Sequence, residues 1–193
     1  MTTSPIGLTV EPIDGLSAME YTFTLKYQVT AADAGDHDAL VEELAEAGCD
    51  DALVGIGQPG RLALEFTRKA ADAGAAVRSA LADVRRAVPS ARLIEVSPDL
   101  VGLTEVAEIV GVSRQNMRKL MLAHPGSFPA PVHEGSASIW HLAEVLTWLQ
   151  AKGSYALAKD VLDVAQVALQ VNVAKEGRRL LRSVSKELEA LVG

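Results

Sequence analysis

The sequence has little cysteine, few aromatic residues and no long uncharged apolar run. Its 193 residues include a single cysteine, Cys49, which cannot form an intrachain disulfide or a cysteine-rich zinc site. Aromatic residues make up 4% of the chain, so a core has to rest mainly on Ala, Val and Leu. No apolar stretch is long enough to span a bilayer, and residues 1–15 lack the basic flank and apolar centre of a secretory signal. These absences favour a cytoplasmic protein.

The remaining composition is that of a globular chain with an uneven distribution of charge. Apolar residues make up 49% and charged residues 22%, and the length is sufficient for more than one small domain. The net charge is −7, and residues 1–98 hold 8 basic and 15 acidic side chains, whereas the rest is nearly neutral. Between Glu108 and Glu134 there is no acidic residue. This interval contains five basic side chains, Arg114, Arg118, Lys119, His124 and His133.

Residues 19–98 predict a ferredoxin-like domain of α+β class. Apolar and polar residues alternate from Tyr21 to Thr30, which is typical of a half-buried strand. The complete pattern gives strands at 19–30, 52–56, 61–68 and 91–96, with helices beginning after Asp36 or Asp38 and after Asp72. This βαββαβ order predicts one antiparallel sheet with two helices on one face. Residues 1–18, with two prolines and two glycines, are expected to form a flexible arm.

Residues 99–193 predict a second domain and a helical segment. Ser97, Pro98 and Asp99 suggest a linker, followed by short helices at 104–110 and 114–122 and another at 141–150 that ends at Gly153. The second domain is therefore expected at 99–152. Residues 153–193 contain an apolar stripe at helical spacing, in one long helix or in a hairpin divided at Gly177. The stripe comprises Leu157, Val161, Val164, Ala168, Val171, Leu181, Val184, Leu188 and Leu191. Because the second domain is small, we expect a second copy of the chain to cover this stripe. The alternative is that the stripe folds back on the N-terminal sheet of its own chain.

Residues 103–121 carry the most informative motif. Ala107 permits close crossing of two helices, Gly111 suits the tight turn between them, and Ser113 suits the N-cap of the second helix. Once Met117 and its apolar neighbours are buried, five polar residues remain outside: Arg114, Gln115, Asn116, Arg118 and Lys119. Arg, Asn and Gln pair with base edges in the major groove, and Lys and Arg hold phosphates. The motif therefore predicts a recognition helix.

With the segment that follows, this motif resembles the winged helix-turn-helix of MerR-like and AlpA-type phage regulators and excisionases. The resemblance covers residues 101–152 and includes a second block, in which Phe128-Pro129 matches the entry to the wing and Ile139-Trp140 leads into the closing helix. It implies DNA binding by Thr104, Ser113, Arg114, Gln115, Asn116, Arg118, Lys119 and His133. One feature departs from the family pattern, because residues 133–138 contain no Arg or Lys to hold phosphate in the wing.

The sequence thus predicts a sequence-specific DNA-binding protein, acting as a dimeric transcriptional regulator on double-stranded DNA. The alternative is a protein–protein adaptor, such as an antitoxin or phage-defence accessory, in which the helix-turn-helix is secondary. We expect the N-terminal domain to bind a protein or small-molecule partner. A basic stripe formed by Lys175, Arg178, Arg179, Arg182 and Lys186 is either a solvated face or a contact for phosphates or for the acidic N-terminal domain.

No catalytic constellation or cofactor site is expected in this chain. The GxGxxG spelling at 55–60 precedes a predicted strand rather than a helix, so it indicates a hairpin turn instead of a dinucleotide site. Asp36, His37 and Asp38 are consecutive and cannot all point toward one metal ion, so a helix cap is the better interpretation. We therefore expect no enzyme activity, no cofactor and no metal.

Overall fold

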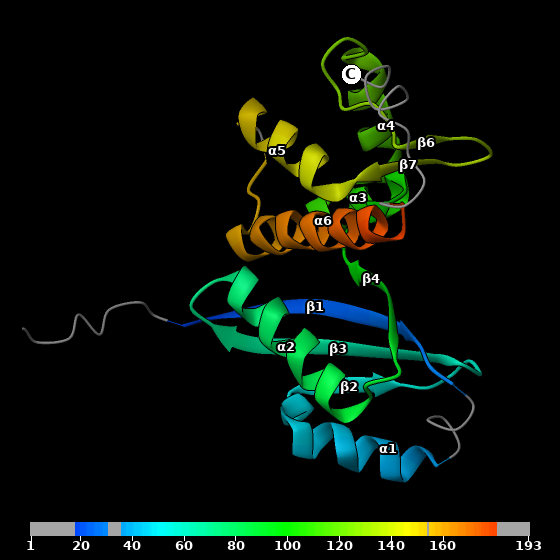
Figure 1. Cartoon of the computed structure of the whole chain (residues 1–193). Helices are drawn as coiled ribbons and strands as arrows, with labels where there is room; N and C mark the ends of the chain where they lie inside the picture. The colour runs from blue at the N-terminus through cyan, green and yellow to red at the C-terminus, as the bar shows by residue number, and fades with distance from the viewer. Residues whose placement is uncertain (1–17, 31–35, 154, 181–193) are drawn as a thin grey trace, which may run out of the picture.

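The computed structural model describes residues 18–30, 36–153 and 155–180, and it is a mixed α+β structure with a long C-terminal helix (Figure 1). Apart from residue 18, the predicted arm at 1–18 lies outside the described residues, as does the second half of the apolar stripe, from Leu181 onward. Within the described ranges, no helix combines the length and the apolar character needed to cross a membrane.

The N-terminal unit is built on a four-stranded sheet with the order β2-β3-β1-β4. Its strands are β1 (Met19–Gln28), β2 (Ala52–Gly55), β3 (Arg61–Ala70) and β4 (Arg92–Ser97). All neighbouring strands are antiparallel, and Phe23 in β1 lies opposite Phe66 in β3. The predicted alternation is confirmed, because Tyr21, Phe23 and Leu25 are buried while Thr22 and Lys26 are exposed. One face of the sheet therefore packs and the other faces solvent.

Two helices of this unit begin at the aspartates that the sequence indicated. In α1 (His37–Leu44), the Asp36 carboxylate accepts hydrogen bonds from the amides of residues 38 and 39. In α2 (Ala73–Ala87), Asp72 accepts one from the amide of residue 75 at 2.7 Å. A π-helical turn, η1 (Ala45–Cys49), follows α1 and includes Gly48 at φ 96°, a conformation that favours glycine. The β2–β3 connection is a hairpin, so residues 55–60 form a turn as predicted.

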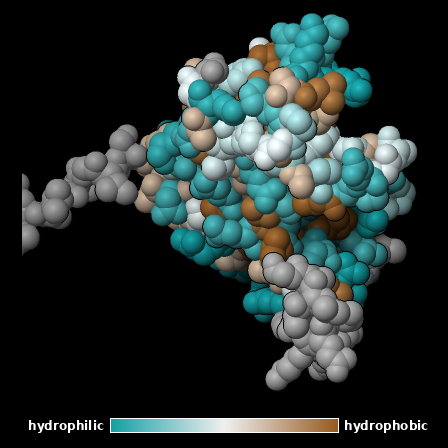
Figure 2. All heavy atoms as spheres, turned by 90° about the horizontal axis from the view of Figure 1, so that it is seen from above, coloured by the Kyte–Doolittle hydropathy of each residue, from teal (hydrophilic) through white to brown (hydrophobic). Residues whose placement is uncertain are grey.

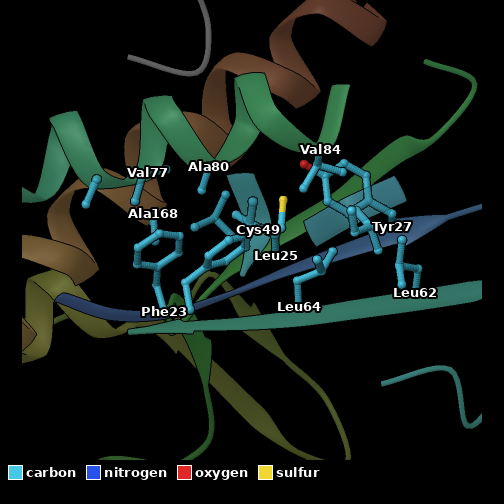
Figure 3. Packing of buried hydrophobic residues seen from close by; sticks show 14 of the residues in the cluster. Phe23, Leu25, Tyr27, Cys49, Leu62, Leu64, Val77, Ala80, Val84 and Ala168 are labelled. Atoms are coloured by element: carbon cyan, nitrogen blue, oxygen red, sulfur yellow. The ribbon is translucent and has the colours of Figure 1, made fainter. Parts of the chain in front are cut away.

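The core of the N-terminal unit lies between the buried face of the sheet and three helices. Figure 3 shows its side chains from the sheet, from α2 and from the helix that contains Ala168. Phe23 and Phe66 stack with ring centroids 5.3 Å apart, and Val77, Ala80 and Val84 of α2 pack in the same cluster. The third helix is α6 (Lys159–Leu180), which adds Val164 and Ala168. The sequence pattern predicted two helices on this face, and the additional helix begins more than seventy residues after the end of α2.

The second unit combines three helices with a small sheet of order β5-β7-β6. Its elements are β5 (Leu100–Val101), α3 (Leu103–Val110), α4 (Arg114–Ala123), β6 (His133–Glu134), β7 (Ser138–His141) and α5 (Leu142–Lys152). Its buried cluster includes Val106, Met117, Trp140 and Leu146. Leu162 and Ala165 of α6 belong to this cluster as well, so α6 contributes to both cores.

The position of α6 decides between alternatives that the sequence left open. Gly177 lies inside the helix, so the described part of the segment is one continuous helix, not a hairpin. The prediction that the apolar stripe needs a second chain to cover it is wrong for Val164 and Ala168, which are buried against the sheet of their own chain. For these two residues the alternative holds, in which the stripe folds back on the N-terminal sheet of the same chain.

Side chains of α6 also occupy the free edge of β4. The Asn172 amide accepts a hydrogen bond from the Val96 N–H at 2.9 Å and donates one to the Val96 carbonyl at 2.8 Å, as a neighbouring strand would. Lys175 donates to the carbonyl of Ile94. Two side chains thus satisfy backbone groups that an edge strand otherwise exposes.

Seen from above, the described surface of the molecule is mainly hydrophilic, with small hydrophobic patches between the hydrophilic regions (Figure 2).

Candidate nucleic-acid interface

Two short helices, α3 and α4, meet at a tight turn. Gly111 ends α3 at φ 74°, a left-handed conformation that residues with a Cβ adopt at a cost. The Val112 N–H donates to the Ala107 carbonyl at 2.9 Å, and the Gly111 N–H donates to the Glu108 carbonyl at 3.1 Å. These bonds satisfy the carbonyls at the end of α3 and set the direction in which α4 leaves the turn. The predicted helix–turn–helix geometry around Gly111 is therefore present.

The first turn of α4 is capped by Ser113. The Ser113 side-chain oxygen accepts a hydrogen bond from the Asn116 N–H at 3.1 Å, as predicted for an N-cap. The other amides of this turn have no partner within the helix, because the first N–H groups of any α-helix lack an acceptor one turn earlier. A helix end of this kind attracts anionic groups such as phosphate.

Along α4, burial separates one apolar face from a polar one. Met117 is buried at 1% exposure and Leu120 is half-buried, so these two side chains fix the helix against the rest of the unit. All five side chains predicted for the recognition helix are exposed: Arg114, Gln115, Asn116, Arg118 and Lys119. Within the described part of the chain, none of the three cations among them forms an ion pair. Their charges therefore remain available to an external anion.

The other predicted contact residues lie on neighbouring elements. Thr104 is exposed in the first turn of α3, Ser113 is exposed at the N-cap of α4, and His133 is exposed at the start of the β6–β7 hairpin. In this hairpin His133 pairs with Ile139 and Glu134 pairs with Ser138. The hairpin itself offers no lysine or arginine and exposes Glu134, so it carries less positive charge than α4 does.

An aromatic cluster holds the loop after α4 in place. The Trp140 indole N–H donates to the Pro129 carbonyl at 3.1 Å, and the Phe128 ring meets Trp140 and Trp148 edge-on at 6.1 and 5.1 Å. His124, just beyond the end of α4, packs edge-on against Trp148 with centroids 5.3 Å apart. Val106 and Met117 of the first sequence block belong to the same buried cluster as Trp140, so the two blocks of the resemblance meet in one core.

A buried polar joint at the junction of the two units was not foreseen. Asp99, which the sequence suggested to be part of a linker, is 2% exposed. Its carboxylate lies 2.7 Å from the His141 Nδ1 and accepts a hydrogen bond from the Asn172 amide at 2.7 Å. Its backbone carbonyl accepts from the Leu142 N–H at 2.7 Å. The segment predicted as a linker at 97–99 therefore includes the last residue of β4 and a buried carboxylate, and its close packing depends on distant residues that no local pattern indicates.

Comparison with known proteins agrees with this geometry over one segment. No curated protein and no solved structure matches the chain. Residues 99–153 match the family model described as prophage CP4-57 regulatory protein (AlpA). This range spans the two helices of the turn, the hairpin and α5, and it coincides with the predicted resemblance at 101–152. The segment at 99–153 is therefore similar to the AlpA family of phage regulatory proteins.

Proposed function

We propose that this protein is a sequence-specific DNA-binding regulator whose α4 lies in the major groove. The observation that carries the proposal is the division of α4 into a buried face around Met117 and an exposed polar face without internal ion pairs. The match of residues 99–153 to a family of phage regulatory proteins supports it. The proposal assigns no reaction, metal or cofactor to the chain, and it places the protein in the cytoplasm, where DNA is accessible.

Each exposed residue has a distinct part in this proposal. Arg114, Gln115 and Asn116 occupy the first turn of α4, and recognition helices commonly reach base edges from this turn. Arg118 and Lys119 follow and hold phosphates, together with the amides that Ser113 leaves uncapped. Thr104 on α3 and His133 in the hairpin contact the sugar–phosphate backbone of the DNA. The base contacts would select the sequence, and the phosphate contacts would fix the position of the protein on the duplex.

We also propose a fold type for each of the two units. The strand order β2-β3-β1-β4 with antiparallel pairing supports a ferredoxin-like arrangement for the N-terminal unit. The hairpin after α4 and its pairing with β5 support a winged helix-turn-helix for residues 99–152. In this arrangement the N-terminal unit binds a partner or ligand and the second unit binds DNA.

We propose further that two copies act together on DNA. A single module of this size buries a small interface with DNA, so a dimer that reads two half-sites gains affinity by linkage. The C-terminal segment remains the proposed contact, since part of its predicted stripe continues beyond the described helix. Light scattering on the full chain with and without its DNA site tests this proposal. A complex with one copy per site at micromolar protein would refute it.

A binding-site selection with the full chain tests DNA recognition directly. The wild-type protein should enrich one motif from random duplexes, and Arg114→Ala or Asn116→Ala should relax the preference at one position by about 1–3 kcal/mol. Arg85→Ala, an exposed arginine at the end of α2, is the matched control and should leave the motif unchanged. If the folded wild-type protein enriches no motif, the proposal fails and the adaptor alternative gains support.

A further inference from the structure

Two adjoining hollows form a groove along β4 and the C-terminal half of α6. One measures about 550 Å³ and lies beside the start of β4, and the other measures about 500 Å³ and extends to β5. They share the lining residues Ile94, Lys175 and Glu176, so they are parts of one continuous depression. We refer to it as the α6 groove. It lies outside the helix-turn-helix surface, since no residue of α4 lines it.

The first half of the α6 groove is strongly cationic. Its lining includes four cations, Arg61, Arg92, Lys175 and Arg179, and a single acid, Glu176. Glu176 already pairs with Lys175 at 2.9 Å and with Arg179 at 3.0 Å. Arg61 and Arg92 are exposed and form no ion pair with any described residue. In a chain with a net charge of −7, this concentration of positive charge favours an anionic ligand.

The second half of the α6 groove contains four apolar side chains, Ile94, Leu100, Val173 and Leu180, beside polar residues that are bonded within the protein. Leu100 and Val173 are 48% and 56% exposed, large fractions for residues of their kind, and Ile94 is half-buried between them and the cations. The three acids here already have partners: Glu95 pairs with Lys26 at 2.6 Å, Glu176 pairs with Lys175 and Arg179, and the buried Asp99 is bonded to His141 and Asn172. None of these carboxylates is therefore free to recruit a cation to the groove.

We infer that the α6 groove binds a small organic anion with an apolar body. The acidic head, a carboxylate or a phosphate, lies between Arg61 and Arg92, whose guanidinium groups can each bind two oxygens of such a group. The apolar body lies along Ile94, Leu100 and Val173. The volume is within the range of sites for small molecules. Charge complementarity favours such an anion over an uncharged apolar ligand, because the uncharged ligand would form no ion pair with Arg61 or Arg92. The inference goes beyond DNA binding and does not depend on it.

Calorimetric titration of the full chain with four probes tests the inference. Octanoate and octyl phosphate carry both head and body, inorganic phosphate carries the head alone, and octanol carries the body alone. We expect each of the two amphipathic anions to bind at least tenfold more tightly than either partial probe. The stronger of the two identifies the preferred head group. Equal binding of octanol and octanoate, or no binding of either anion at millimolar concentration, would overturn the inference.

Substitutions locate the site. Arg92→Gln should weaken both amphipathic anions by about tenfold, and Val173→Asn should weaken them several-fold without changing the binding of inorganic phosphate. Both side chains are exposed, so the fold should tolerate these changes. Arg85→Gln on α2, which does not line the groove, is the matched control. Unchanged affinity in both groove variants would overturn the inference. Affinity that falls as protein concentration rises would also overturn it, because a second copy of the chain would then occupy the groove.

Discussion

Replacement of Asn172 by alanine should destabilise the protein strongly, since this one side chain joins α6 to β4 and to the β4–β5 connection. It is 8% exposed and makes three hydrogen bonds, two with the backbone of Val96 and one with the Asp99 carboxylate. Alanine leaves all three partner groups without this bond, and each buried group that loses its partner costs about 1–3 kcal/mol. The α6 groove borders Asn172, so water can reach the gap and the total should be near the lower end, about 3–5 kcal/mol.

Urea unfolding measures this effect with two independent signals. Both tryptophans, Trp140 and Trp148, belong to the second unit, while far-UV circular dichroism reports all elements. Thermal unfolding provides a second measurement. For a chain of this size, a loss of about 3–5 kcal/mol lowers the melting temperature by roughly 6–20 °C. Gln170→Ala, an exposed change on the same helix, should alter the free energy of unfolding by less than about 0.5 kcal/mol.

A second variant at the same position sharpens the test. Asn172→Asp keeps an acceptor for the Val96 N–H but removes both donors and places a carboxylate beside Asp99. It should therefore be at least as destabilising as the alanine variant at neutral pH, although its size is nearly unchanged. A loss below about 1 kcal/mol in Asn172→Ala would refute the joint as a source of stability.

Three further predictions concern single side chains. Lys119→Ala should weaken binding to all DNA sequences alike and reduce the salt slope by about 0.9, measured by fluorescence anisotropy at several salt concentrations, whereas Lys69→Ala on the sheet should not. Burial raises the pKa of the Cys49 thiol from 9.0 to about 11. The unfolded thiol therefore ionises first, and the free energy of unfolding should fall between pH 9 and pH 11, less so in Cys49→Ala. The buried Arg68 guanidinium pairs with Asp51 at 2.8 Å and with Asp83 at 2.7 Å. Arg68→Met should therefore lower the free energy of unfolding in urea by about 3–5 kcal/mol, because both carboxylates lose this partner, while Arg85→Met should be nearly neutral.

Local patterns were sufficient to predict most elements of the chain. The alternation in β1 and the capping aspartates before α1 and α2 depend on residues close together in sequence, and the structure contains them where they were expected. The same holds for Gly111 and Ser113, since turn and cap preferences act over three or four residues. The exposed face of α4 follows from helical periodicity once Met117 is assigned to the core.

Contacts between residues far apart in the sequence could not be predicted from local patterns. The Asn172 contacts with Val96 and Asp99 join positions separated by more than seventy residues, and no local pattern distinguishes a polar residue that caps a strand edge from one that faces solvent. For the same reason Asp99 suggested a linker, because Pro98 and a carboxylate are typical of loops. The role of α6 in both cores depends on the relative position of two units, and helical periodicity alone does not determine that position.

The sharing of α6 between two cores has a consequence for the order of events during synthesis. Both units leave the ribosome before α6 does, so each must wait with part of its apolar surface uncovered. During this interval the free edge of β4 is open to pairing with any extended chain nearby. The arrival of α6 closes the edge and both cores in one step, so slow translation between α5 and α6 should lengthen the period in which nascent chains are prone to aggregate.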